Sequence, residues 1–270
     1  MYLKKQNLKN KIALVTGAGK GLGKACAIAL AEAGANLIII SRTKKDLDAV
    51  SKVIKKYKSK CKSYVCDVTN YNEIKSVIYS QKRIDILVNN AGYIWHSAIH
   101  NMTDDQWDAM LDIHVSAQFR ILRAYGKWLR ANADRNSHIR KVVNISSTMG
   151  LHGGATQLAY SAGKAAVVGL TKTLAKEWGR FNVTVNAVAF GAIDTRLTSP
   201  YDTEPNIAIV KGQERKVGLS LQQIEDNKAA SPLGKIGSPE DAANAIYLMC
   251  IPESDWITGE VLLASGGVRY

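Results

Sequence analysis

The chain has 270 residues, of which 46% are hydrophobic and 22% are charged, a composition typical of a globular protein with an ordinary core. Lysine and arginine exceed aspartate and glutamate by 13, a surplus that attracts phosphorylated cofactors, an acidic carrier protein, anionic lipid or nucleic acid. These values exclude collagen-like, coiled-coil and disordered chains.

Strand-like apolar runs alternate with longer helical patterns along the chain. This alternation predicts one α/β domain over residues 1–270, a Rossmann-type doubly wound parallel sheet with helices on both faces and about seven strands in the order 3-2-1-4-5-6-7. The predicted strands are Ile12–Val15, Asn36–Ile40, Ser63–Cys66, Ile84–Val88, Lys141–Ile145, Val183–Val188 and Glu260–Ala264. The predicted helices are Leu22–Ala33, Lys44–Tyr57, Tyr71–Ser80, Asp104–Arg130, Ala159–Gly179 and Pro239–Cys250.

The segment at about 192–232 does not fit this alternation, because it contains prolines, scattered charges and little periodicity. It follows the sixth strand at its carboxyl end, where open α/β sheets bind ligands. We interpret it as a long loop that covers the substrate, although a plain surface excursion would give the same pattern.

The cysteines and the hydropathy of the chain bear on its compartment. The four cysteines form neither a disulfide framework nor a CxxC pair, which indicates buried thiols in a reducing environment. No apolar stretch has the length of a signal peptide or of a membrane span. We therefore expect a cytoplasmic protein.

A glycine-rich turn follows the first predicted strand and leads into a helix. Its sequence, Thr16-Gly17-Ala18-Gly19-Lys20-Gly21-Leu22-Gly23, does not match GxGxxG in either frame but does match TGxxxGxG. Glycines allow close approach to a pyrophosphate, and the helix N-terminus offers free N–H groups. This turn predicts a dinucleotide site.

The end of the second predicted strand indicates which dinucleotide binds. An NAD site places a carboxylate there, whereas this strand ends in Ser41 and Arg42. A guanidinium suits a 2′-phosphate, and Lys20 could add a second cation. We therefore expect NADP(H) rather than NAD(H), the alternative being that both cations are merely exposed bases.

A serine, a tyrosine and a lysine form a candidate catalytic group. Tyr160 stands 13 residues after Ser147, which follows the fifth predicted strand, and Lys164 lies one helical turn after Tyr160 on the same face. A phenol with its usual pKa near 10 transfers protons poorly at neutral pH, and a nearby cation lowers that pKa. We expect Lys164, with the positive ring of an oxidised cofactor, to lower the pKa of Tyr160 toward neutrality.

Four ordered motifs together resemble the short-chain dehydrogenase/reductase family over nearly the whole chain. They are TGAGKGLG, Asp67-Val68, Asn89-Asn90-Ala91-Gly92, and Ser147 with Tyr160-Ser-Ala-Gly-Lys164. The resemblance implies that Tyr160 is the general acid/base, that Ser147 hydrogen-bonds the reacting oxygen, and that Lys164 holds the nicotinamide ribose and tunes Tyr160. It also implies cofactor contacts from Asp67 and Val68 at the adenine, from Asn90, Ala91 and Gly92 in the cleft, and from Thr195 near the nicotinamide amide.

Two residues depart from the family pattern. His114 stands where many members have an asparagine of the proton relay behind the lysine; histidine can also anchor a water or pass a proton, so we retain it as a catalytic candidate. Phe190 stands where a proline commonly precedes the glycine, near the expected position of the nicotinamide.

Within the family, the chain most resembles 3-oxoacyl-[acyl-carrier-protein] reductases. The resemblance is carried by the stretch from Gly153 to Tyr160 and by the motifs Pro232-Leu233-Gly234 and Ser238-Pro239-Glu240-Asp241. It implies reduction of a carbonyl on a small molecule or a carrier, and assembly as a homotetramer. The stripe Lys172, Lys176 and Arg180 could dock an acidic acyl-carrier protein, or could equally be a solvated helix face.

Other functions remain open at this point. The principal alternative is an alcohol dehydrogenase for a sugar, polyol, steroid or acyl-CoA intermediate, and a remote one is a non-catalytic NADP(H)-binding regulator. No recognition motif accompanies the positive charge, so we expect no specific nucleic-acid partner. His96 and His100 have no obvious third ligand, so we expect no metal site. Four tryptophans, Trp107, Trp128, Trp178 and Trp256, are interpreted as packing anchors, and Trp95 could touch substrate.

Overall fold

Apolar strands form the centre of the molecule, as expected for a sheet that helices cover on both faces. The computed structural model describes residues 7–132, 138–200, 207–210 and 212–268. Its main sheet has seven parallel strands in the order β3-β2-β1-β4-β5-β6-β9, which confirms the predicted fold class. The strands are β1 (Ile12–Thr16), β2 (Asn36–Ser41), β3 (Cys61–Val65), β4 (Ile86–Asn89), β5 (Arg140–Ser147), β6 (Val183–Phe190) and β9 (Val261–Ala264).

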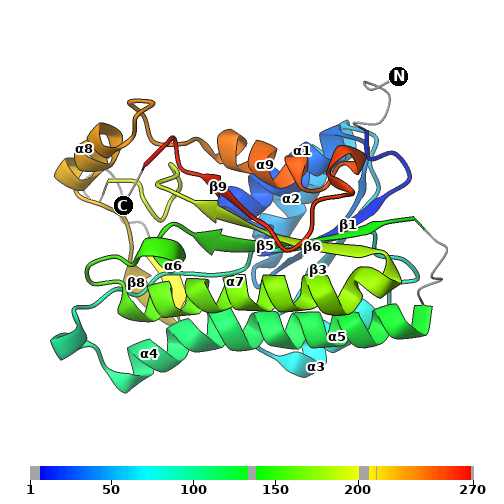
Figure 1. Cartoon of the computed structure of the whole chain (residues 1–270), viewed down its shortest axis with the longest axis horizontal. Helices are drawn as coiled ribbons and strands as arrows, with labels where there is room; N and C mark the ends of the chain where they lie inside the picture. The colour runs from blue at the N-terminus through cyan, green and yellow to red at the C-terminus, as the bar shows by residue number, and fades with distance from the viewer. Residues whose placement is uncertain (1–6, 133–137, 201–206, 211, 269–270) are drawn as a thin grey trace.

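Helices form a layer on each face of this sheet (Figure 1). One face carries α1 (Gly21–Glu32), α2 (Lys44–Lys56) and α9 (Pro239–Leu248). The other carries α3 (Tyr71–Tyr79), α4 (Asp104–Leu111), α5 (Ala117–Asn132) and α7 (Leu158–Trp178), with the short α6 (Met149–His152) before α7. Among the described helices, none has the length and apolar character of a membrane span. The single-turn 3₁₀ segments are η2 (Ile99–Asn101), η4 (Gly179–Phe181) and η5 (Pro252–Ser254).

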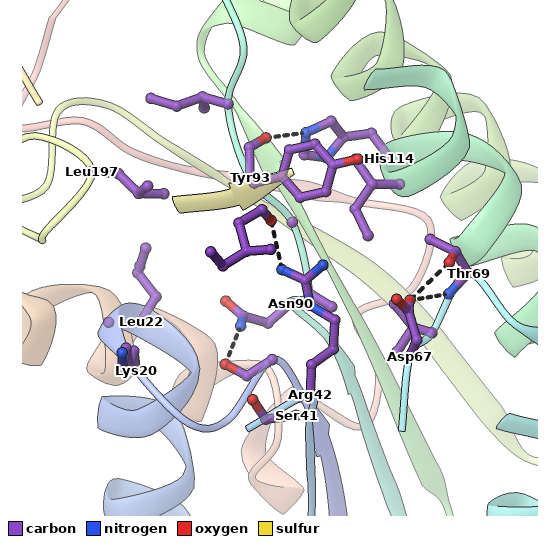
Figure 2. Close-up of a pocket in the computed structure, with 18 of the residues that line it drawn as sticks. Lys20, Leu22, Ser41, Arg42, Asp67, Thr69, Asn90, Tyr93, His114 and Leu197 are labelled. Atoms are coloured by element: carbon purple, nitrogen blue, oxygen red, sulfur yellow. Dashed lines mark hydrogen bonds between the residues drawn. The ribbon is translucent and has the colours of Figure 1, made fainter. Parts of the chain in front are cut away.

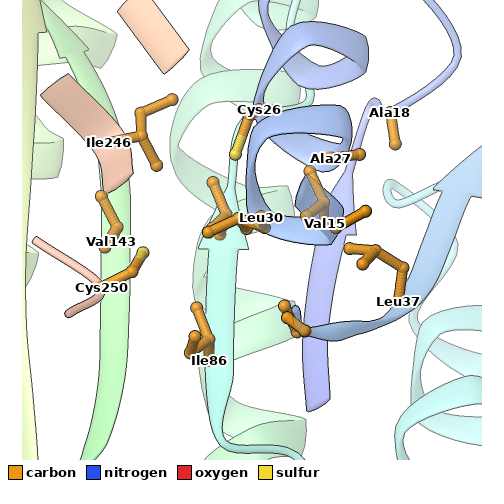
Figure 3. Packing of buried hydrophobic residues seen from close by; sticks show 14 of the residues in the cluster. Val15, Ala18, Cys26, Ala27, Leu30, Leu37, Ile86, Val143, Ile246 and Cys250 are labelled. Atoms are coloured by element: carbon orange, nitrogen blue, oxygen red, sulfur yellow. The ribbon is translucent and has the colours of Figure 1, made fainter. Parts of the chain in front are cut away.

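Alternate residues of the strands supply two hydrophobic cores, one on each face. In β2, Leu37 and Ile39 face the α1 and α9 layer, whereas Ile38 and Ile40 face the opposite layer. This is the period of two that a strand imposes. Leu30 of α1 packs in the middle of the first core (Figure 3).

The predicted helix Asp104–Arg130 is interrupted rather than regular. A π-helical segment, η3 (Asp112–Ser116), lies between α4 and α5, so the chain stays helical to Asn132 but changes pitch at His114. Extra residues of this kind inside helices are frequent at functional sites. Apolar periodicity could not reveal it, because one wide turn barely changes the hydrophobic pattern.

The segment at about 192–232, expected as a long loop that covers the substrate, contains regular secondary structure. The segment contains an antiparallel hairpin of β7 (Ile207–Val210) and β8 (Gln213–Lys216), followed by α8 (Leu221–Ala230). Ser220 and Gln223 form a capping box at the start of α8, a signal that is visible in the sequence. The hairpin strands are only four residues each, which is too short for periodicity to be decisive.

The tryptophans divide into buried and exposed groups. Trp128 and Trp178 are buried against Tyr125, as expected of packing anchors. Trp256, by contrast, is 98% exposed just before the edge strand β9, so its interpretation as a packing anchor within the chain was wrong. Phe190, one of the two departures from the family pattern, is buried in the first core.

Replacing Leu30 by alanine should lower the free energy of unfolding by about 3 kcal/mol, because loss of the fully buried side chain would leave a cavity between α1 and the sheet. Chemical denaturation would measure the change. Leu248→Ala on α9 is the control, because Leu248 is half exposed and its loss should cost less than about 0.5 kcal/mol. Equal costs for the two variants would contradict the packing described here.

Candidate active site

The carboxyl ends of β1 and β4 meet at the glycine-rich turn. Thr16 ends β1, and its hydroxyl accepts hydrogen bonds from the backbone N–H groups of Asn90 and Ala91, both at 3.1 Å. The Asn90 side chain donates to the carbonyl oxygens of Thr16 and Gly17. These bonds hold the turn between β1 and α1 against the segment that follows β4.

Glycine is required at two positions of this turn. Gly17 has a φ of +66°, a conformation that residues with a Cβ rarely adopt. A Cβ on Gly23 would lie 2.3 Å from the Gly17 carbonyl oxygen and 2.4 Å from the Asn90 amide nitrogen. The backbone therefore packs too tightly here for any side chain, which leaves the N-terminus of α1 open to a ligand.

The ends of β2 and β3 form the far end of the same cleft. Asp67 accepts hydrogen bonds from the backbone and hydroxyl of Thr69, which fix its carboxylate (Figure 2). The Lys20 ammonium lies 3.3 Å from the Asp46 carboxylate. Arg42 donates from Nη2 to the carbonyl oxygen of Ile209 at 2.8 Å. Two cations thus stand at this end of the cleft, as the sequence predicted.

Ser147, Tyr160 and Lys164 come together at the carboxyl end of β5. The Ser147 hydroxyl accepts from the Met149 N–H at 3.2 Å and is hydrogen-bonded to Tyr160. Lys164 is buried on α7 one turn beyond Tyr160, and its Nζ donates to the carbonyl oxygen of Ile145 at 2.8 Å. The Lys164 ammonium lies 5.7 Å from the centre of the Tyr160 ring.

Burial changes the pKa of both α7 groups. It raises the pKa of the Tyr160 phenol above its usual value, and the hydrogen bond with Ser147 opposes this only in part. Burial lowers the pKa of Lys164 from 10.5 to about 8. In the chain alone the pKa of Tyr160 is thus raised rather than lowered, because loss of hydration is its largest cause. The expected shift toward neutrality includes the positive ring of an oxidised cofactor and stays a prediction. A protonated phenol is the form that can donate a proton.

His114 lies in the π-helical segment against Tyr160. Its Nε2 is 2.8 Å from the carbonyl oxygen of Tyr93, which can only accept, so Nε2 carries the hydrogen (Figure 2). Burial and the charge of Lys164 hold the pKa of His114 well below its usual value. The imidazole is therefore neutral, with an unprotonated Nδ1 that has no hydrogen-bond partner among the described residues.

A second histidine, His96, also packs against Tyr160. The rings of His96 and His114 both meet the Tyr160 ring edge-on, with centroid distances of 5.8 and 5.1 Å. His96 is held by its neighbour Ser97, whose N–H donates to the carbonyl oxygen of Thr156. Sequence reasoning considered His96 only as a metal ligand, and its place beside Tyr160 depends on a loop contact that no motif encodes.

A cavity of about 540 Å³ joins the cation end of the cleft to Tyr160. Most of the predicted site residues line it, whereas Thr16, Gly23 and Ser147 are not among its lining residues. The predicted residues in the lining are Gly17, Lys20, Gly21, Leu22, Ser41, Arg42, Asp67, Val68, Asn90, Ala91, Gly92, His114, Tyr160, Lys164 and Thr195. Sequence reasoning missed Tyr93, Leu197 and three hairpin residues, Ile207, Ile209 and Gly212, which also line it.

Comparison with known proteins places this arrangement in a family. The family model described as short chain dehydrogenase matches residues 11–206. The chain belongs to the short-chain dehydrogenase/reductase family. It is 35% identical over 265 residues to the 3-oxoacyl-[acyl-carrier-protein] reductase FabG of Thermotoga maritima, with 97% of this chain and 98% of that protein covered. The resemblance inferred from the motifs is thereby confirmed, and the chain is an oxidoreductase of this family.

Relatives that act on sugar acids are similar to the chain at nearly the same level. It is 33% identical over 270 residues to the 2-dehydro-3-deoxy-D-gluconate 5-dehydrogenase of Pseudoalteromonas atlantica, with 98% of each chain covered. A solved structure from Agrobacterium tumefaciens, described as a candidate 2-deoxy-D-gluconate 3-dehydrogenase with bound NADP, superposes with a TM-score of 0.82 at 32% identity. That comparison covers 97% of this chain and 98% of the other.

Replacing Lys164 by methionine should raise the free energy of unfolding near pH 7 by up to about 3 kcal/mol, because the folded state no longer holds a buried ammonium. The folded-state pKa is lowered, so the destabilising effect of Lys164 is complete below about pH 8 and vanishes as the pH rises toward 10.5. Denaturation across this pH range would measure it. Lys172→Met, on the exposed face of α7, should show no such dependence; a less stable Lys164→Met near pH 7 would contradict the prediction.

Proposed function

We propose that the protein is an NADP(H)-dependent reductase that converts a ketone into a secondary alcohol, with a 3-oxoacyl thioester on an acyl-carrier protein as its substrate. The observation that carries this proposal is the single cavity that joins Arg42 and Lys20 at one end to Tyr160 and Lys164 at the other. A dinucleotide with a 2′-phosphate carries that phosphate at one end and its reactive nicotinamide ring at the other. The cavity has cations for the phosphate at one end and the candidate proton donor for the reaction at the other.

The residues present fit NADP(H). The lack of space for a side chain at Gly23 lets backbone N–H groups at the start of α1 approach a pyrophosphate. The guanidinium of Arg42 would hold the 2′-phosphate with charge-assisted hydrogen bonds, and Lys20 would add a second cation. Asp67 and Val68 would contact the adenine, and Asn90, Ala91, Gly92 and Thr195 would line the path to the nicotinamide. When bound, NADPH supplies a hydride to the carbonyl carbon.

Tyr160 acts as the general acid in this proposal. Its hydroxyl and that of Ser147 hydrogen-bond the substrate carbonyl oxygen, and the phenol transfers its proton to that oxygen as the carbon accepts hydride. The raised pKa of Tyr160 keeps the phenol protonated at neutral pH. Lys164 holds the nicotinamide ribose, and its charge stabilises the phenolate that remains.

His114 takes the place of the family asparagine in the proton relay. Its unprotonated Nδ1 is a buried acceptor that faces Gly92, and the charge of Lys164 acts on this imidazole. A water between Nδ1 and the Lys164 ammonium would satisfy both groups. Because the imidazole is neutral, it serves as a hydrogen-bond acceptor rather than as a charged acid.

The 3-oxoacyl thioester is favoured by the FabG relatives and by the charge of the chain. Acyl-carrier proteins are acidic, and the net charge of +13 attracts them. Lys172, Lys176 and Arg180 are exposed along α7 and its end, which supports docking there. The second candidate substrate is a sugar acid, favoured by the NADP-bound structural neighbour and the gluconate-type relative. Fatty-acid biosynthesis in the cytoplasm is the setting that the first candidate implies.

NADPH oxidation with acetoacetyl-carrier protein should be rapid, and Tyr160→Phe should lower kcat about a thousandfold because the proton donor is lost. The absorbance of the reduced nicotinamide would follow the reaction. Tyr57→Phe, at the exposed position that follows the last residue of α2 and does not line the cavity, should leave kcat unchanged.

The same assay separates the two candidate substrates. Turnover of a gluconate-type sugar acid with NADP⁺, combined with no turnover of the thioester, would replace the first candidate by the second. Binding of NADPH without turnover of either substrate would point to a regulator instead of an enzyme.

We also propose that the chain assembles as a homotetramer, as the family resemblance implies. Exposed apolar side chains gather at two places that suit such interfaces. Phe119 lies on the outer face of α5, and Trp256 and Ile257 precede the edge strand β9, where Leu263 is also exposed. Four copies that each use two different isologous interfaces form a tetramer with closed symmetry.

Sedimentation equilibrium should give a mass of about four chains of 29.4 kDa. Trp256→Asp should reduce the assembly to dimers, because it places a charge in the apolar contact beside β9, whereas Tyr57→Asp on α2 should leave it intact. A monomer in the unmodified protein would refute the tetramer.

A further inference from the structure

The β7–β8 hairpin spans the cavity from the cation end to the region of Tyr160. Ile207, Ile209 and Gly212 line the same cavity as Gly17 and Gly21 of the glycine turn. In the close-up, the strand crosses above Asn90 and between Leu197 and Tyr93 (Figure 2). The hairpin therefore covers the cofactor cleft as well as the region where substrate would enter.

Arg42 attaches the hairpin at the cation end. Its Nη2 donates to the carbonyl oxygen of Ile209 at 2.8 Å, a bond between residues 167 positions apart in the chain. A guanidinium has five N–H donors in one plane. A single bond to Ile209 leaves donors for a phosphate, so one side chain can hold both the hairpin and an anion.

Arg215 attaches the other strand of the hairpin near Tyr160. Its guanidinium lies 4.5 Å from the centre of the Trp95 ring, a cation–π contact. The next residue, His96, packs edge-on against Tyr160. A movement of the hairpin would therefore reach the residues around the phenol through Trp95 and His96.

We propose that Arg42 is a positioning residue that couples the 2′-phosphate of the cofactor to closure of the hairpin over the substrate. The coupling rests on the NADP(H) preference proposed above. The exposed guanidinium of Arg42 already donates to Ile209, and a 2′-phosphate would neutralise it and hold it in this orientation. NADH lacks this phosphate, so it would fill the cleft without strengthening the bond between Arg42 and the hairpin.

Limited digestion with trypsin tests the proposal directly, because Arg215 and Lys216 are cleavage sites within the hairpin. Saturating NADPH should slow cleavage there about tenfold, the shift that one hydrogen bond to a charged group supports, whereas saturating NADH should slow it much less. In Arg42→Ala, saturating NADPH should give no more protection than NADH. Mass spectrometry of the fragments identifies the cleaved bond.

Steady-state kinetics supply a second measurement. At saturating NADPH, Arg42→Ala should raise the KM for the carbonyl substrate several-fold, an effect that loss of cofactor affinity alone would not produce. The matched control is Lys45→Ala, which removes an exposed cation three residues away that does not line the cavity. It should change neither the digestion pattern nor this KM.

The outcomes separate this proposal from the one on which it rests. Equal affinity for NADPH and NADH would overturn both, because the 2′-phosphate would then have no partner. A clear NADPH preference with equal protection of Arg42→Ala and the unmodified protein would overturn only the coupling. Protection by NADPH alone that disappears in Arg42→Ala would establish it.

Discussion

The arrangement of the site depends on the hydroxyl of Thr16, which joins the carboxyl end of β1 to the segment that follows β4. It accepts the N–H groups of both Asn90 and Ala91, while the Asn90 amide donates back to the glycine turn. Neighbouring parallel strands bring their carboxyl ends to one edge of the sheet, and these bonds join two of those ends into a single wall. The absence of a side chain at Gly23 is the steric condition for that contact.

A second constraint is the burial of ionisable groups around Tyr160. Tyr160, Lys164 and His114 are all removed from water, and in each case burial is the main cause of the change in pKa. The shifts keep the phenol protonated and the imidazole neutral, and they bring Lys164 within reach of deprotonation just above neutral pH. The buried ammonium of Lys164 lowers the free energy of unfolding. The packing of the rest of the domain offsets this cost.

The hairpin lines the cleft and contacts residues at both of its ends. Without it, the glycine turn and the α7 residues would form an open groove at the sheet edge. The two arginine contacts, one to Ile209 and one to Trp95, connect that groove's ends through a segment far along the chain. A positively charged chain whose cavity runs from Lys20 and Arg42 to Tyr160 suits the phosphorylated dinucleotide proposed above.

The sequence by itself determined the parallel sheet, the glycine turn and the pairing of Tyr160 with Lys164. Each follows from local rules: continuous apolar runs for covered strands, glycine where the backbone must approach closely, and a spacing of four on a helix. The place of Ser147 beside this pair was implied by the family resemblance. The cavity lining therefore included most of the residues predicted for it.

Tertiary structure alone decided the π-helical turn at His114, the position of His96, the hairpin and the direction of the Tyr160 pKa. The first three depend on contacts between segments distant in sequence, such as Ser97 with Thr156 and Arg42 with Ile209, for which no periodicity exists. The pKa depends on how much water the fold removes from the phenol. Spacing specifies which charge is near a group, whereas only the packed structure determines how well solvent still reaches it.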